Sequence, residues 1–324
     1  MKWVEVLVSN GRVRSGWRFL ISAAMVVSAQ FSVGILLGIT FDIAGREPAH
    51  ALFWASCLTL PALLAVFKIL TSFFEKKPLR SIGLAFCGRW AAELGIGLAL
   101  GTLMVLAVAA LELGLGAARF SWNSISMGQV MEGGAYYGAL FAVAATNEEL
   151  MFRGYPFQRL IEALGPAAAV GVSSALFGAA HLGNPSHSWL STLNTALVGV
   201  PLAVAYLRTR ALWLPIGIHF AWNFILGYGL GFQVSGIAFT RTLFSANVNG
   251  LPWLTGGTYG PEGGGLATIV IVVATVYLLF SRSIYMSAEM RELALGAANG
   301  MPRGAGRNVL LQTVDSTGMS AGHE

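Results

Sequence analysis

Charged residues are scarce in this chain of 324 residues: Asp, Glu, Lys and Arg together make up 11% of it, whereas hydrophobic residues make up 55%. Soluble domains carry about 25% charged residues, so the composition excludes an ordinary water-soluble domain. The mean hydropathy of +0.67 agrees with this. Several apolar runs of about 20 residues follow one another, and each is long enough to cross a bilayer as a helix. The sequence therefore predicts an all-α, polytopic transmembrane helical bundle.

Cysteine and aspartate are also rare. Cys57 and Cys87 are too few for a disulfide framework and form no CxxC pair. Asp42 and Asp315 both lie outside the apolar runs, which excludes a catalytic aspartate pair inside the membrane. The chain has no HExxH, and its apolar runs contain no GxSxG, which excludes the common signatures of zinc proteases and serine hydrolases inside the membrane. The Gly-rich loop at 231–264, with the stretch at 255–265 at its end, lacks the lysine of a phosphate-binding loop, so we expect this segment to be a flexible extracytoplasmic loop.

The apolar segments and the basic residues between them predict a topology. Connections rich in Lys and Arg alternate with connections that have one or none. Because basic loops stay in the cytoplasm, both termini are predicted to be cytoplasmic, and the net charge of +5 reflects orientation rather than nucleic-acid binding. The first apolar segment is too long for a signal peptide. The predicted spans are 19–41, 51–74, 91–111, 134–152, 166–183, 188–207, 211–230 and 265–281.

This topology suggests three regions. Residues 1–18 form a cytoplasmic basic arm. Residues 19–281 form the transmembrane bundle. Residues 282–324 form a cytoplasmic tail, predicted to be disordered because it is rich in Gly, Ala and Ser and poor in apolar residues from about residue 296.

Ionisable residues inside apolar helices are costly and indicate functional sites. The fourth span ends in "NEELMFRG" at 147–154, which carries two adjacent glutamates and an arginine. Glu149 and Arg153 are four residues apart and can pair on one helix face. Glu148 is rotated about 100° from Glu149, so it is expected to face the bundle interior separately.

Two histidines also lie within apolar helices. His181 follows Phe177 by four residues in the fifth span, and His219 precedes Asn223 by four residues in the seventh. Each pair therefore shares a helix face. If the fourth span continues through the amphipathic segment 155–165, Glu148 lies about 18 Å along the helix from Tyr136, at 1.5 Å per residue. The two histidines can lie at a similar depth in the membrane.

A glutamate and two histidines that meet in a membrane favour hydrolysis of an acyl bond, by either of two routes. The carboxylate can take a proton from water, while His219 and Asn223 donate hydrogen bonds to the developing oxyanion. Alternatively, Glu148, His181 and His219 can hold a divalent metal such as zinc with an open position for water. The residues alone do not separate these routes, so no cofactor is assigned.

Three short motifs in the chain resemble those of a known protein family. "EELMFR" (148–153) matches EExxxR, "FGAAH" (177–181) matches FxxxH and "HFAWN" (219–223) matches HxxxN. In this order, on successive membrane helices, they resemble the CAAX-protease and bacteriocin-processing family, also called type II CAAX prenyl endopeptidases or Abi proteins. The resemblance is strongest over about 135–225.

The resemblance implies a glutamate-dependent intramembrane endopeptidase. Glu148 would activate the water and His181 would assist it, while His219 and Asn223 would form the oxyanion site. Glu149 and Arg153 would hold the architecture. Eukaryotic members of this family remove the last three residues of prenylated proteins, but many bacterial members have no known substrate, so the resemblance leaves the substrate open.

Two other classes of function stay open on the residues alone. One is a membrane scaffold or adaptor that binds a partner within the bilayer. The other is a proton-coupled transporter, with Glu148 and the histidines as a relay. Under the protease hypothesis the partners are the bilayer and a membrane-associated protein or peptide substrate. The Ala- and Gly-rich composition and the short loops suggest a bacterial inner membrane.

Overall fold

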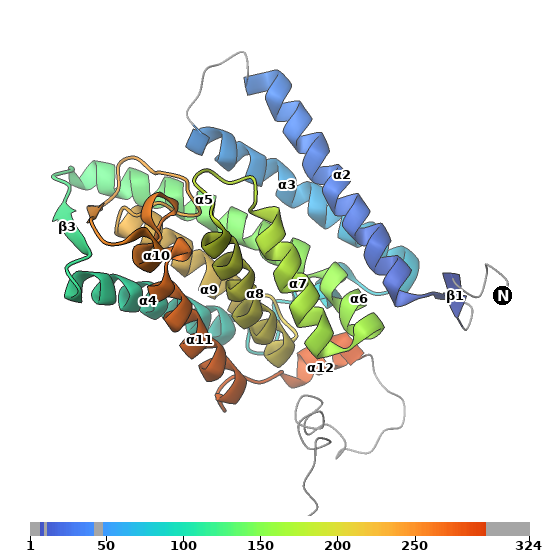
Figure 1. Cartoon of the computed structure of the whole chain (residues 1–324). Helices are drawn as coiled ribbons and strands as arrows, with labels where there is room; N and C mark the ends of the chain where they lie inside the picture. The colour runs from blue at the N-terminus through green and yellow to red at the C-terminus, as the bar shows by residue number, and fades with distance from the viewer. Residues whose placement is uncertain (1–6, 10–11, 42–47, 296–324) are drawn as a thin grey trace, which may run out of the picture.

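Apolar helices make up most of the chain in the computed structural model, which describes residues 7–9, 12–41 and 48–295 (Figure 1). A helix satisfies its own backbone N–H and C=O groups, which is the condition for a chain segment to lie in lipid. The predicted all-α helical bundle is therefore confirmed. The bundle helices are α2 (Ser15–Phe41), α3 (Pro48–Leu70), α4 (Trp90–Gly114), α5 (Met127–Arg153), α7 (Pro166–Ala180), α8 (Trp189–Thr209), α9 (Trp213–Phe224) and α11 (Gly265–Phe280).

Not every bundle helix is long enough to span a bilayer on its own. α7 and α11 are apolar but have only 15 and 16 residues. α5 has 27 residues and ends in the charged stretch that carries both glutamates. The number of eight spans and the cytoplasmic position of both termini therefore stay predictions. Within the described part of the chain, the segments that qualify by length and composition are Ser15–Ile39, Ala51–Glu75, Trp90–Gly114 and Trp189–Thr209.

α5 ends at a sharp turn. The sequence permitted one continuous helix through residues 155–165, but the chain turns at Gly154 (φ −76°, ψ −135°). A Cβ at Gly154 would lie 2.3 Å from the carbonyl oxygen of Leu150, so only a residue without a side chain allows this turn. Residues Tyr155–Leu164 form a separate amphipathic helix, α6. The turn leaves Glu148 little more than one helical turn from the end of α5.

Two strands that the sequence did not indicate pair near one end of the bundle. β3 (Ala118–Trp122) is antiparallel to β4 (Phe244–Val248). β4 belongs to residues 231–264, for which a flexible loop was expected. This segment instead folds onto the bundle: a Cβ at Gly236 (φ +82°) would lie 2.0 Å from the carbonyl oxygen of Pro185. Local patterning could not reveal contacts between segments so distant in sequence.

The two ends of the bundle carry different elements. Figure 1 places β1, α6 and α12 toward one end and β3 at the other. The shorter elements are β1 (Val8–Ser9), β2 (Arg12–Val13), η1 (Thr71–Glu75), η2 (Leu79–Ile82), η3 (Ile225–Gly229), α10 (Pro252–Thr255), η4 (Gly257–Tyr259), η5 (Pro261–Gly263) and α12 (Ala288–Leu295).

α12 differs from the prediction of a disordered tail over 282–324. Its Met290 is buried against Ala85 and Ala211, so the beginning of this segment is folded onto the bundle. The predicted disorder from about residue 296 lies outside the described residues.

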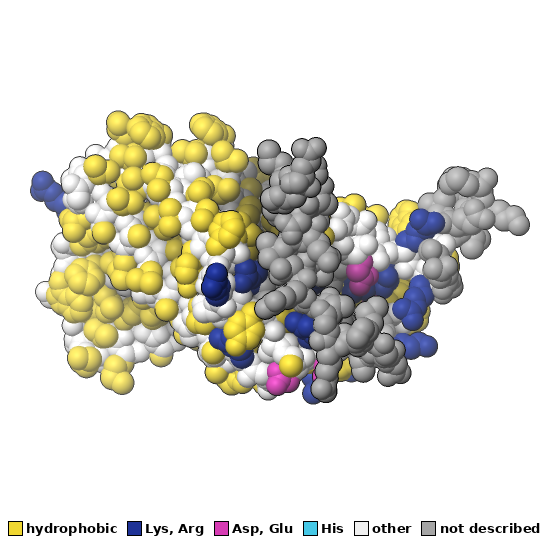
Figure 2. Space-filling model, turned by 90° about the horizontal axis from the view of Figure 1, so that it is seen from below, with side chains coloured by type: hydrophobic (Ala, Val, Ile, Leu, Met, Phe, Trp, Pro, Cys, Tyr) yellow, Lys and Arg dark blue, Asp and Glu magenta, His cyan; other side chains and the backbone are white. Residues whose placement is uncertain are grey.

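The surface has broad hydrophobic areas, as lipid contact requires. On the face shown in Figure 2, hydrophobic side chains cover much of the left part, whereas most basic side chains lie toward the centre and the right. Large hydrophobic side chains are well exposed on α2 and α11, for example Phe31, Ile39, Val273 and Phe280. Water-soluble monomers rarely expose apolar areas of this extent. The surface therefore agrees with a membrane protein.

Close contact between α4 and α9 fixes the helix that carries His219. A Cβ at Gly97 of α4 would lie 2.4 Å from the carbonyl oxygen of Leu214, and a Cβ at Gly217 of α9 would lie 2.6 Å from that of Leu94. Small residues let membrane helices approach until their backbones touch. Glycine on both helices therefore sets the position of α9, and with it that of His219.

We expect Gly97→Ala to lower the apparent melting temperature of the purified protein, because the added methyl group forces α4 and α9 apart. Overpacking of this kind costs about 1–3 kcal/mol. Gly95→Ala is the matched control, since a Cβ at Gly95 meets nothing within 4 Å. Thermal unfolding in detergent measures both variants, and equal melting temperatures would show that the contact does not hold the helices together.

Candidate active site

Glu148, His181 and His219 come together from three different helices. Glu148 lies on α5, His181 directly follows α7 and His219 lies within α9. The Oε2 atom of Glu148 is 3.8 Å from Nε2 of His181 and 3.7 Å from Nε2 of His219. These distances are too long for direct hydrogen bonds. Oε2 of Glu148 is buried and has no hydrogen-bond partner in the described residues, so the three atoms surround a position for one small group.

The other ring nitrogen of each histidine has an acceptor. Nδ1 of His181 lies 2.8 Å from the carbonyl oxygen of Phe177, and Nδ1 of His219 lies 2.8 Å from Oε1 of Glu149. A carbonyl or a carboxylate only accepts, so Nδ1 carries the proton in both rings. Both rings are thereby held with Nε2 directed at Glu148.

Glu149 and Arg153 form the ion pair that their spacing predicted. NH1 of Arg153 is 3.2 Å from Oε1 of Glu149, and both side chains are fully buried. NH2 of Arg153 also donates to the carbonyl oxygen of Gly199 on α8, at 3.2 Å. The same carboxylate oxygen holds His219, so Glu149 links α5 to α9 directly and to α8 through Arg153.

The aromatic ring of Phe177 packs against both histidines and against Arg153. Its ring centroid is 4.8 Å from that of His181 and 6.1 Å from that of His219. The guanidinium carbon of Arg153 lies 4.4 Å from the centre of the Phe177 ring. A cation over an aromatic face gains electrostatic energy when water is excluded. Phe177 therefore contacts both histidines and helps to accommodate the buried arginine.

Asn223 lies one helical turn beyond His219 and borders the same space. Both side chains are buried, and with Glu148, Phe177 and His181 they line a small pocket of about 60 Å³. A volume of this size holds a few water molecules. The structure thus brings all the predicted site residues into one region, with Glu149 and Arg153 behind His219 rather than in the pocket.

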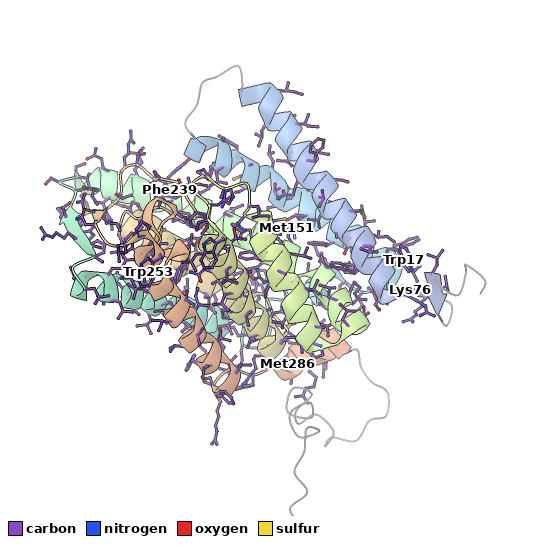
Figure 3. All side chains as sticks on the ribbon, in the orientation of Figure 1. Trp17, Lys76, Met151, Phe239, Trp253 and Met286 are labelled. Carbon is purple, nitrogen blue, oxygen red and sulfur yellow. The ribbon has the colours of Figure 1, made fainter. Side chains whose placement is uncertain are left out.

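A larger cavity of about 600 Å³ adjoins this pocket. Glu148, His181 and Asn223 line both spaces. The rest of the wall is mostly apolar and comes from α2, α5, α6, α7 and the segment after α9; Met151 and Phe239, labelled in Figure 3, belong to it. The polar groups therefore stand at one side of an apolar space large enough for a lipid chain or a peptide segment.

Sequence reasoning missed Glu262, which borders the small pocket. Its Oε1 accepts a hydrogen bond from Trp222 Nε1 at 2.8 Å, and its Oε2 accepts from Ser235 Oγ, also at 2.8 Å. Glu262 thus ties residues 231–264 to the helix that carries His219. The Gly-rich sequence around Glu262 gave no indication of this role, because its partners come from other parts of the chain.

Two further glutamates on α4 were also not considered from the sequence. Glu93 and Glu112 are buried, and their carboxylate oxygens have no hydrogen-bond partner in the part of the chain that the structure describes. Neither lines the two cavities around Glu148.

The separations between the donor atoms are compatible with a metal ion or with a water molecule at this position. Zinc ligands about 2.0 Å from the metal lie about 3.3 Å from one another, whereas Glu148 Oε2 is 3.8 and 3.7 Å from the two histidine nitrogens. Partner atoms of a tetrahedral water with hydrogen bonds of about 2.8 Å lie about 4.6 Å apart, so the measured separations lie between the two arrangements. In the described ranges, no group of three or more His, Cys, Asp and Glu side chains has the arrangement of a metal site.

We expect the two adjacent glutamates to differ in their effect on stability. Glu149→Ala leaves the buried charge of Arg153 uncompensated, and loss of one partner of a buried pair costs about 3–5 kcal/mol. Glu148→Ala removes a side chain that is 27% exposed and has no direct hydrogen bond at Oε2, so its melting temperature should stay close to that of the wild type. Thermal unfolding compares them. The double variant Glu149→Leu with Arg153→Met should recover part of the loss, and similar losses for both single variants would contradict this division.

Comparison with known proteins agrees with the motifs. Residues 133–225 match the family model described as type II CAAX prenyl endopeptidase Rce1-like, a family of peptide hydrolases. No curated protein and no solved structure gives a significant match. The matched segment contains every predicted site residue, from Glu148 to Asn223. The motif-bearing core of this membrane protein, residues 133–225, therefore matches the Rce1-like family of type II CAAX prenyl endopeptidases, the resemblance that its three motifs predicted.

Proposed function

We propose that this protein is an intramembrane endopeptidase that hydrolyses a peptide bond with a water molecule activated by Glu148. The observation that carries the proposal is the arrangement around Oε2 of Glu148, with the Nε2 atoms of His181 and His219 at 3.8 and 3.7 Å. A water between these atoms could make hydrogen bonds to all three. The family match supports peptide hydrolysis as the class of reaction.

In the first step, Glu148 accepts a proton from the water while the oxygen attacks the carbonyl carbon of the peptide. His181 orients the water through Nε2, because its Nδ1–H is held by the carbonyl oxygen of Phe177. The C=O double bond becomes a C–O single bond, and its electron pair forms an oxyanion. A carboxylate beside water in a site with little solvent is a suitable general base.

The oxyanion is stabilised by donors on α9. Asn223 donates from its side-chain amide, and His219 donates from Nε2 when its ring carries both protons, with Nδ1–H held by Glu149. Donors that are fixed before the reaction stabilise the charge without reorganisation. The protonated Glu148 then gives its proton to the nitrogen of the leaving amine, the C–N bond breaks and the carboxylate is restored.

The cavity indicates the class of substrate. A space of about 600 Å³ with a mostly apolar wall meets the polar groups at Glu148, His181 and Asn223. An apolar wall of this kind favours a membrane-associated peptide, carried by a lipid anchor or by a hydrophobic segment. We place the protein in a bacterial inner membrane with the topology predicted above.

We expect Glu148→Gln to reduce proteolysis by about 10²–10⁴-fold, because the amide cannot accept the proton from water. Wild-type and variant proteins in proteoliposomes would be given a membrane proteome, and mass spectrometry would identify new C-termini. Glu132→Gln is the matched control: it lies on the same helix, but its side chain is 70% exposed.

Fragments produced by the wild type and by Glu132→Gln, but not by Glu148→Gln, would support the protease. If folded wild-type protein makes no such fragments, the protein acts as a scaffold. Solute uptake that depends on a pH gradient and on Glu148 would instead identify a proton-coupled transporter. A parallel reaction with a chelator tests whether a metal takes part.

Once a substrate is known, we expect Asn223→Ala to lower kcat by about 10²–10³-fold with little change in KM, because the oxyanion loses a donor. Asn223→Gln, which keeps the amide, should recover part of the rate. Steady-state kinetics on a cleaved peptide measures both constants. A higher KM with unchanged kcat would mean that Asn223 binds the substrate rather than stabilising the oxyanion.

A further inference from the structure

A second, open cleft lies at the end of the molecule that carries β1, outside the candidate active site. It has a volume of about 1130 Å³ and is formed by residues 12–20, the second half of α6 and Val172 of α7. Arginines and apolar side chains both contribute to it. Phe19 and Leu160 line this cleft as well as the cavity beside Glu148, so these two side chains form a shared wall.

Acidic residues near the cleft compensate only part of its positive charge. Glu75 pairs with Arg18 at 2.5 Å and with Arg159 at 2.6 Å. Glu162 is within 3.3 Å of Arg18 and within 2.9 Å of Arg159. The charges of these two arginines and two glutamates therefore cancel.

The positive charge that these glutamates do not compensate comes from Arg12 and Arg14. Both are exposed, and neither takes part in an ion pair with another described residue. Lys76, labelled in Figure 3 at the same end as Trp17, adds a further basic group nearby. Two positive charges thus line the cleft without a carboxylate partner among the described residues.

The local fold holds the two arginines in place. β1 pairs with β2, with Ser9 opposite Arg12, and the backbone N–H of Arg14 donates to the carbonyl oxygen of Leu7 at 3.0 Å. α2 begins at Ser15 with no acidic residue in its first turn. The positive end of this helix dipole therefore acts in the same direction as the two arginines and favours an anion.

Apolar side chains continue from the basic end of the cleft. Leu20 and Leu164 are more than half exposed, and Val172 and Trp17 are more than one third exposed. Guanidinium groups bind phosphate through paired hydrogen bonds. A free phosphate would use the arginines alone, whereas a phospholipid would also cover the apolar side chains.

We propose that this cleft binds an anionic phospholipid, with its phosphate on Arg12 and Arg14 and its acyl chains along Leu20, Leu164 and Val172. The bound lipid would lie against α2 and α6 on the other side of the Phe19 and Leu160 wall from the proposed substrate cavity. α2 packs against the rest of the protein mainly through α3 and α6, so the lipid would brace the helix that closes one side of that cavity.

The test is lipid binding by the full-length protein in detergent, measured by native mass spectrometry during titration with phosphatidylglycerol or phosphatidylcholine. We expect Arg12→Ala with Arg14→Ala to weaken phosphatidylglycerol binding by about 30-fold, because each basic residue near a membrane surface contributes a factor of about five. Phosphatidylcholine binding should change little. The measurement does not depend on proteolysis, so its outcome is independent of the proposed function.

Arg119→Ala with Arg241→Ala is the matched control. It removes the same net charge from the opposite end of the molecule, where Arg119 lies on β3 and the Arg241 side chain is 65% exposed. It should keep the affinity of the wild type. An equal loss in both double variants, or equal binding of both lipids by the wild type, would overturn the proposal.

A second variant tests the acyl chains. Leu164→Ser keeps both arginines and replaces an exposed side chain, so the protein should fold, and we expect weaker binding of phosphatidylglycerol. Inorganic phosphate, titrated as a competitor, separates the two sources of a phosphate group. Complete displacement of the lipid by phosphate, together with no effect of Leu164→Ser, would show a free-phosphate site and contradict the lipid proposal.

Discussion

The buried ion pair of Glu149 and Arg153 is the interaction on which the rest of the site depends. Two charges in an apolar bundle are stable only when each is paired and hydrogen-bonded. Glu149 meets this condition through Arg153 and His219, and Arg153 through Glu149, the carbonyl oxygen of Gly199 and the ring of Phe177. These partners belong to α5, α7, α8 and α9. The contacts that stabilise the two charges therefore also fix the four helices relative to one another.

The adjacent glutamates divide two tasks that one residue could not perform together. Glu149 is fully buried and holds His219, whereas Glu148 is 27% exposed and borders open space. The proposed general base needs room for water and for substrate, whereas Glu149 uses Oε1 to hold both Arg153 and His219. The rotation of about 100° between neighbours on a helix gives each side chain its own surroundings.

Close backbone contacts fix the positions of the helices that carry these residues. Gly97 and Gly217 let α4 touch α9, and Gly199 lies against Ser174, which brings α8 onto α7. Glu262 then connects Trp222 of α9 to Ser235 beside the small pocket. The polar groups are thereby held in a site with little water on one side and an apolar cavity on the other, where hydrogen bonds and charges act more strongly than in water.

The sequence by itself determined the helical class, the positions of the bundle helices and the pairing of Glu149 with Arg153. Apolar runs and i, i+4 spacing are local properties of the sequence. They can therefore be recognised without knowing which helices pack together. It also indicated Glu148, His181, His219 and Asn223, because polar groups in apolar helices are few. Only the tertiary structure decided the turn at Gly154, the β3–β4 pairing, the hydrogen bonds of Glu262 and the apolar cavity beside Glu148. These features arise where segments distant in sequence meet, and no local pattern records which segments will touch.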